Sequence, residues 1–144
     1  MGHARPEKVQ GLIPHRPPML VLDELLSVTG EAAESRTVFD EGCLFLSADG
    51  QVEEAVLFEM MAQTFAALAC CQRGAETAGS AGFLVGLKRV ALRGRARLGF
   101  PVTVKVRIFS QVEDFSVVDG EAFQDGELLA AGQLTIYVPR EGRA

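Results

Sequence analysis

The stretch EAVLFEMMAQTFAALACC, residues 54–71, decides the fold of this 144-residue chain. It is almost wholly apolar and consists largely of alanine, leucine and methionine, which favour helix. A membrane-spanning helix needs about 20 apolar residues and rarely carries an acid at its centre, whereas Glu59 and Gln63 interrupt this one. We therefore expect a helix that begins near Glu53 or Glu54, ends near Gly74 and is buried inside a soluble domain.

Beyond the helix and a small-residue loop (74–82), the hydrophobic pattern has a period of two. Val102, Val104, Val106 and Ile108 alternate with polar residues, as in an antiparallel strand with one face in the core. Asp125-Gly126 between two apolar runs is a strong hairpin signal. Together with a turn around Gly30, these patterns predict strands near 19–28, 34–39, 83–92, 102–108, 115–123 and 128–138.

A helix that is apolar on nearly all sides has to be covered on all sides. One antiparallel sheet of five or six strands, wrapped around one long central apolar helix, is the economical arrangement. The sequence therefore predicts an α+β protein with the hot-dog fold. No linker or repeat divides the chain, so we expect a single domain over 1–144, with flexible tails at 1–9 and 139–144.

Composition excludes several classes of function. The chain has 14 Lys plus Arg against 19 Asp plus Glu, a net charge of −5, which argues against a general nucleic-acid binder. Its three cysteines suggest no disulfide framework and its N-terminus is no secretory signal, so we expect a cytoplasmic protein that does not bind a membrane. Two histidines without spaced partners predict no metal site.

Glu59 is the first candidate for chemistry. Burying a carboxylate among apolar neighbours is costly unless it gains hydrogen bonds or a proton, and a carboxyl in that state suits proton transfer. Gln63 lies one helical turn further along the same face and could orient it. The alternative is a carboxylate at the rim, or one capped in the core by arginine or backbone groups.

His15 is the histidine that lies within the ordered pattern, in the proline-rich segment PHRPP at residues 14–18. It could act as a general base, or it could pin this stiff loop to the sheet through its ring nitrogens. Seven of the 14 basic residues fall within positions 88–107. They form either a solvated strand face or a patch, with Arg93, Arg95 and Arg97 at its centre, that steers an anionic partner.

Two motifs carry a family resemblance. LIPHRPPMLVLD at residues 12–23 resembles the opening L-P-H-R-x-P-F-L-L-V-D of the β-hydroxyacyl-acyl carrier protein dehydratases, and EMMAQ at 59–63 resembles their helix motif E-A-M-A-Q. FLVGL at 83–87 is similar to their F-A-G-I strand. The resemblance covers about residues 10–138, and PHRPPM with FEMMAQ is most similar to the divergent, aryl-polyene-type branch.

The resemblance implies a hot-dog homodimer, or a higher oligomer, that takes an acyl chain on the phosphopantetheine of an acyl carrier protein or CoA and needs no other cofactor. It implies that a histidine and the helix acid remove water from a 3-hydroxyacyl thioester. Glu59 matches that acid. Substrate contacts are then expected from Gln63, Phe45, Glu54 and Gly86, and carrier-protein docking from Arg93, Arg95 and Arg97.

One departure from the family pattern leaves the function open. The family histidine lies in a G-H-F-P-x-x-P-x-x-P-G loop, where this chain has GCLFLSADGQVEE. Counting back from Glu59 puts Phe45 in place of the histidine and Glu53-Glu54 in place of the P-G pair. Either His15 replaces the missing base in a dehydratase of fatty-acid or polyene-type synthesis, or the protein is an acyl thioesterase or a non-catalytic thioester-binding subunit.

Overall fold

In a computed structural model of the chain, residues 9–73 and 82–139 are described. The expected tails and the expected loop 74–82 lie outside these residues, apart from Val9, Gly82 and Pro139. Val9 is buried. The elements are a 3-10 turn (Val9–Gly11), β1 (Glu24–Thr29), β2 (Ala32–Val38), α1 (Ala55–Arg73), β3 (Phe83–Leu92), β4 (Pro101–Val112), β5 (Phe115–Gln124) and β6 (Glu127–Tyr137).

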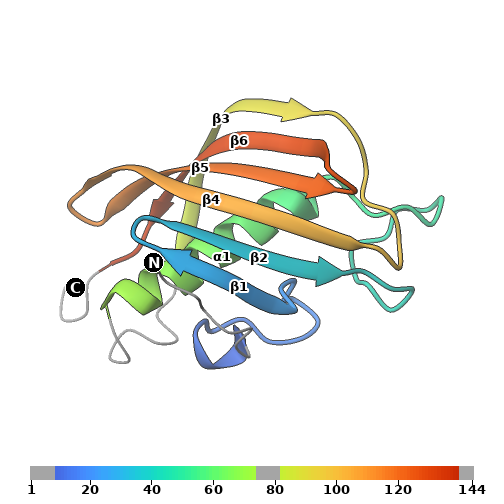
Figure 1. The fold of residues 1–144 in the computed structure, drawn as a ribbon, viewed down its shortest axis with the longest axis horizontal. Coiled ribbons are helices and arrows are strands. Elements are labelled where there is room, and N and C mark those ends of the chain that lie inside the picture. Colours follow the sequence, from blue (N-terminus) through green and yellow to red (C-terminus); the bar gives the residue numbers. More distant parts are fainter. Residues whose placement is uncertain (1–8, 74–81, 140–144) are drawn as a thin grey trace.

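The six strands form one antiparallel sheet in the order β1-β2-β4-β5-β6-β3. The sheet curves over α1, which packs against its inner face (Figure 1). This arrangement confirms the predicted α+β hot-dog fold. β1 and β3 are the two edge strands.

The β5–β6 hairpin forms where the sequence predicts it. Asp125 and Gly126 have φ angles of 53° and 76°. Both lie in the left-handed region, as the two central residues of a type I′ turn require, and this turn matches the twist of the flanking strands. The Asp-Gly pair therefore sets the register in which Gln124 pairs with Glu127.

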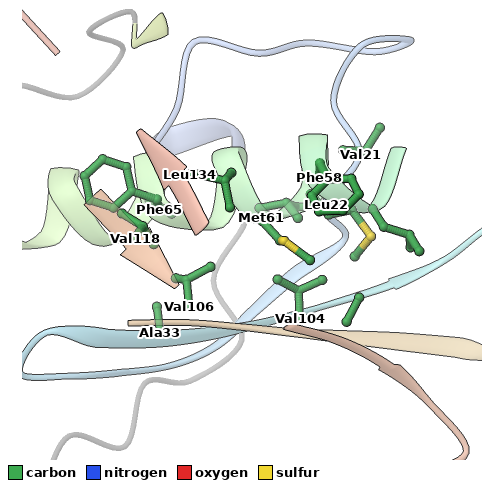
Figure 2. Packing of buried hydrophobic residues seen from close by; sticks show 14 of the residues in the cluster. Val21, Leu22, Ala33, Phe58, Met61, Phe65, Val104, Val106, Val118 and Leu134 are labelled. Atoms are coloured by element: carbon green, nitrogen blue, oxygen red, sulfur yellow. The ribbon is translucent and has the colours of Figure 1, made fainter. Parts of the chain in front are cut away.

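The core lies between α1 and the inner face of the sheet. Val102, Val104, Val106 and Ile108 of β4 are all buried, as their alternation predicts. Figure 2 shows Met61 and Phe65 of the helix among strand side chains that include Val104, Val106 and Val118. Phe65 and Met61 are fully enclosed.

Two glycines let the helix approach the sheet closely. Gly120 of β5 and Gly132 of β6 are paired across the two strands. A Cβ atom at Gly120 would lie 2.6 Å from Met61 Sδ, and one at Gly132 would lie 2.9 Å from Phe58 Cε1. Both distances are shorter than real carbon contacts, so these positions require glycine for the helix to pack as it does.

The helix confirms the prediction of a buried core element. Ala55–Gln72 has a mean hydropathy of 1.3, long and apolar enough to cross a membrane by length and composition. However, 67% of this segment is buried within the fold. Burial of this extent is typical of the core helix of a globular fold.

The first strand begins later than predicted, at Glu24 rather than near residue 19. The reason is that side chains, not a neighbouring strand, satisfy the backbone of Val21. Its N–H donates to Gln63 Oε1 at 2.9 Å, and its carbonyl accepts a bond from Thr37 Oγ1 at 2.6 Å. β2 begins at Ala32, two residues before its predicted start.

Candidate functional site

A pocket opens between α1, the proline-rich loop at residues 12–23 (the entry loop) and the ends of β3 and β6. Its polar groups include His15, from the loop, and Glu59, from the helix. The wall beyond them is mostly apolar and includes Ala62, Phe65, Ala66, Leu84 and Ile136. The pocket therefore offers one polar end for chemistry and a lining suited to a hydrocarbon chain.

His15 and Glu59 face each other in this pocket. Nε2 of His15 lies 3.7 Å from Oε1 of Glu59, and the two side chains are 26% and 34% exposed. This separation is too long for a hydrogen bond. Both groups are thus open to the pocket and close enough to act on neighbouring atoms of one substrate.

The entry loop that carries His15 is fixed by its own contacts. Arg16 donates through NH1 to the carbonyl oxygens of Ile13 and His15, at 2.9 and 2.8 Å. The N–H groups of Met19 and Leu20 donate to the Arg16 carbonyl. Prolines at positions 14, 17 and 18 restrict the backbone further.

The ring of His15 does not pin this loop to the sheet. Nδ1 is buried, yet it has no hydrogen-bond partner within the part of the chain that the structure describes. Nε2 points to Glu59 instead. Neither ring nitrogen therefore bonds to the sheet, and the one polar contact of the ring is with Glu59 of α1.

Gln63 lies behind Glu59 rather than in the pocket wall. Its side chain is fully buried. Nε2 donates to Glu59 Oε1 at 2.8 Å and to the Met19 carbonyl at 3.0 Å, and Oε1 accepts the Val21 N–H. The sequence suggests that Gln63 orients Glu59 and contacts substrate; in the structure it bridges the entry loop and the acid.

Three other expected substrate contacts lie away from this pocket. Phe45 packs on the other side of the entry loop, in a groove with Pro17 and Leu20. Glu54 faces Arg95 at 3.9 Å, and Gly86 pairs with Thr135 at an irregularity of β3. A residue count along the chain could not place Phe45 and Glu54, because the loop 40–54 folds back on its own backbone through the bond from the Glu53 N–H to the Phe45 carbonyl.

The three arginines expected to dock a partner differ in their surroundings. Arg95 lies 3.5 Å from Asp49 and donates to Gln51 Oε1 at 3.0 Å. A hydrogen bond from the Ser47 hydroxyl, together with a backbone bond from Gln51 and the charge of Arg95, lowers the pKa of Asp49. This cluster ties the loop that precedes α1 to the segment after β3.

Arg97 is also engaged, whereas Arg93 is exposed. Arg97 forms an ion pair with Asp125, and its guanidinium lies 4.8 Å from the ring centre of Phe100. Within residues 9–73 and 82–139, no ion pair of Arg93 is found. Of the three arginines, Arg93 is therefore the one whose charge remains available to a partner.

The site also contains residues that the sequence did not indicate. The Met19 carbonyl and the Val21 N–H hold Gln63, and Leu84 and Ile136 line the apolar wall. Backbone groups leave no trace in a sequence pattern. Leu84 and Ile136 look like any strand residues until β3 and β6 are seen to close this end of the sheet.

Taken together, the site pairs an acid with an imidazole at one end of a mostly apolar pocket. Such a pair can take a proton from one atom of a bound chain and give one to another. Among the described residues no group of three or more His, Cys, Asp or Glu side chains could hold a metal ion.

Comparison with solved structures agrees with the fold described above. The dehydratase heterocomplex ApeI:P from Xenorhabdus doucetiae matches over 95% of this chain and 94% of that chain, with 25% identity and a TM-score of 0.85. A putative thioesterase from Ralstonia eutropha JMP134, related to phenylacetic acid degradation, matches with 24% identity and a TM-score of 0.63, over 79% of this chain and 83% of that one. The second match shows the shared fold alone.

The PaaI protein of E. coli, from its phenylacetic acid degradation operon, likewise shares the fold, with 14% identity and a TM-score of 0.63 over 81% of this chain and 78% of that one. No curated protein matches the chain. The family model of the ApeP dehydratases, called ApeP-like, matches residues 7–144. This match covers both motifs that carry the resemblance, and the chain therefore belongs to the ApeP-like dehydratase family.

Proposed function

We propose that this protein dehydrates 3-hydroxyacyl thioesters, with His15 as the base and Glu59 as the acid. The observation that carries the proposal is the 3.7 Å approach of His15 Nε2 to Glu59 Oε1 at the polar end of an apolar pocket. The reacting bonds of the substrate lie on adjacent carbons. Two groups this close can therefore remove a proton from one of these carbons and protonate the hydroxyl on the other.

The reaction balances with these two groups alone. His15, neutral at the start, takes the proton from the carbon next to the thioester carbonyl. The electron pair left there forms the double bond as the C–O bond of the hydroxyl breaks, and protonated Glu59 gives its proton to the leaving oxygen. The products are an enoyl thioester and water, and an imidazolium then faces a carboxylate until a proton returns between them.

The apolar wall supports the choice of an acyl substrate. Ala62, Ala66 and Ala69 leave room along the helix, and Leu84 and Ile136 face them from the sheet. A hydrocarbon chain gains free energy by leaving water for such a lining. We propose that the acyl substrate is delivered on the phosphopantetheine of an acyl carrier protein in the cytoplasm. Arg93 offers a positive charge that would attract an acidic carrier protein.

Phe45 bears on the choice of base. It stands where the family has its histidine, but it lies in a different groove from Glu59 and does not seal the pocket. Among the residues that the structure describes, His15 is thus the imidazole available to this acid. This placement favours catalysis over a site that only binds the thioester.

A second candidate is a partner subunit of another dehydratase. The matching structure from Xenorhabdus doucetiae is that of a heterocomplex. β3 is an edge strand with exposed apolar side chains, including Val85 at 56% and Val90 at 46%. Such an edge has to be covered to avoid uncontrolled association, and we propose that a second hot-dog subunit, identical or paralogous, pairs with it.

Incubation of the protein with 3-hydroxyacyl and 2-enoyl carrier proteins tests these readings. Loss or addition of water without release of free thiol supports the dehydratase. Release of thiol instead identifies a thioesterase. If neither occurs in the isolated protein but activity appears in mixture with a paralogous subunit, the protein is the partner of a heterocomplex.

A further inference from the structure

The face of the sheet that turns away from α1 is called the outer face here. Among the residues that the structure describes, α1 is the sole α-helix, and it packs on the inner face (Figure 1). Where β4 and β5 meet at their hairpin, the outer face carries two large apolar side chains, Val112 at 68% and Phe115 at 45% exposure. Apolar groups that gather on a surface mark an interaction site.

Charged residues continue the outer face along the same two strands. Lys105 and Arg107 lie on β4, and Asp119 and Glu121 lie on β5, each between buried neighbours. The register of the strands puts Arg107 opposite Asp119 and Lys105 opposite Glu121. All four line one hollow in the outer face. The two cations thus belong to one strand and the two anions to the next.

These charges do not neutralise each other within the chain. In the part of the chain that the structure describes, neither Arg107 nor Glu121 has an ion-pair partner. Lys105 lies 3.8 Å from an acid of β2, and Asp119 accepts a hydrogen bond from Gln133 at 3.0 Å. Ion pairing between β4 and β5 of one chain therefore does not account for this arrangement of charges.

The arrangement is complementary to itself. A two-fold axis parallel to the strands, placed between β4 and β5, brings β4 of one copy over β5 of a second copy at the same level. Residues that oppose each other across the two strands of one chain are then the residues that meet between copies, so opposite charges meet and apolar groups meet, as in an isologous interface. The three pairs formed in this way are Arg107 with Asp119, Lys105 with Glu121, and Val112 with Phe115.

We propose that two copies of this chain pack against each other through the outer face, about this two-fold axis. Sheets that pack face to face keep their strand directions within about 30° of each other, which preserves the opposition of β4 and β5 near the axis. A nucleic acid or an anionic membrane would be repelled by the two acids, whereas a second copy satisfies both signs of charge. This contact is separate from pairing through β3 and does not depend on the chemistry of Glu59.

We expect the outer face to form the weaker of the two contacts. Exposed ion pairs contribute little each, whereas pairing through β3 adds main-chain hydrogen bonds between strands. Val85→Lys opposes pairing through β3. This variant should therefore be monomeric at micromolar concentration and should dimerise through the outer face near millimolar concentration, which makes it the background for the test.

Two charge reversals in this background test the proposed axis. With Arg107→Asp, two acids meet on each side of the axis, and with Asp119→Arg, two cations meet there. Each variant alone should raise the Kd of dimerisation on the order of 100-fold, because like charges in contact oppose association. An equimolar mixture of the two variants should dimerise again, because every acid of one chain then faces a cation of the other.

Arg93→Asp is the matched control, since it changes the net charge as Arg107→Asp does but lies outside β4 and β5. It should dimerise like the background. Arg107 and Asp119 are both exposed, so substitution at either position should preserve the fold, which melting temperatures check. Recovery in the mixture cannot come from a bond restored within one chain, because each chain still carries its single reversal.

Sedimentation equilibrium at micromolar and near-millimolar concentration measures each association. Dimerisation of either single variant equal to that of the background would overturn the proposal, as would a mixture no more associated than its components. A background that stays monomeric near millimolar concentration also overturns it. If the charge reversals then change binding of a carrier protein instead, the outer face is the docking site of that partner and not of a second copy.

Discussion

Nε2 of His15 lies 3.7 Å from Oε1 of Glu59, although the two residues are 44 positions apart in the chain. The entry loop brings the imidazole to the pocket and the core helix brings the carboxyl. The buried amide of Gln63 bonds to both elements. An acid and a base therefore meet at the pocket without any bond between them that would have to break before substrate enters.

Glu59→Gln should abolish turnover and leave the melting temperature unchanged or higher. The amide keeps the shape of the side chain and an oxygen that accepts the bond from Gln63, but it has no proton to give. Removing a positioned acid costs on the order of 100- to 10,000-fold in rate. Steady-state dehydration assays and thermal unfolding measure the two quantities, and undiminished turnover would reject Glu59 as the acid.

Gly132→Ala should destabilise the fold by about 1–3 kcal/mol, the usual cost of overpacking. The new methyl group would lie 2.9 Å from Phe58 Cε1, so either the ring or the strand has to move. Gly11→Ala is the control, since no atom lies within 4 Å of a Cβ built there. Urea unfolding of the two variants checks the difference, and equal stabilities would show that the helix does not need this close approach.

The spacing of apolar residues along the chain predicts this fold well, because the residues of an element that face the core have to be apolar. The long apolar helix, the alternating strand β4 and the Asp125-Gly126 turn all lie where the sequence places them. The predicted start of β1 was wrong because the backbone of Val21 bonds to the side chains of Gln63 and Thr37 and not to a neighbouring strand. Such bonds between side chain and backbone depend on the tertiary fold and leave no periodic signal.

The site was predictable only where a single residue type stands out. An acid inside an apolar helix and a histidine among prolines are conspicuous, and the structure brings Glu59 and His15 together. Phe45 and Glu54 were placed by counting along the loop, and the fold of that loop directs them elsewhere. Whether an arginine is paired with an acid also depends on the fold, as Arg95 and Arg97 show.

Arg93→Glu should weaken binding of an acidic carrier protein and reduce its dependence on salt. Arg93 is exposed and carries a charge that attracts such a partner at a distance comparable to the Debye length, about 10 Å at 0.1 M salt. Arg97→Glu should act chiefly through loss of its pair with Asp125. Binding measured at two salt concentrations distinguishes these effects. Identical binding curves for Arg93→Glu and the unaltered protein would show that Arg93 takes no part in docking.

Val85→Lys should convert an oligomer into monomers. Val85 is 56% exposed on the edge strand β3, and lysine on an edge strand opposes pairing with another strand. Phe109→Lys is the control, because Phe109 is 67% exposed but belongs to β4, inside the sheet. Sedimentation at micromolar concentration reports the mass, and a monomer in the unaltered protein would contradict assembly through β3 in the isolated chain.

His15→Asn tests whether His15 is the base. Asparagine keeps the backbone of the loop, including the carbonyl that accepts a bond from Arg16, but it cannot take a proton as imidazole does. We expect turnover to fall about 100-fold or more. The ring nitrogens bond to no other group in the described part of the chain, so the free energy of unfolding should change by no more than about 0.5 kcal/mol.

Arg16→Ala is the control variant that shows how loss of a residue holding the loop affects stability and rate. Arg16 holds the carbonyls of Ile13 and His15 through one nitrogen, so its loss should loosen the loop and lower the melting temperature. If His15 were a pin, His15→Asn would lower the melting temperature in the same way, with a rate loss no larger than that of Arg16→Ala. If His15 is the base, the two variants diverge: one loses rate at constant stability, and the other loses stability first. Full turnover in His15→Asn would instead reject His15 as the base.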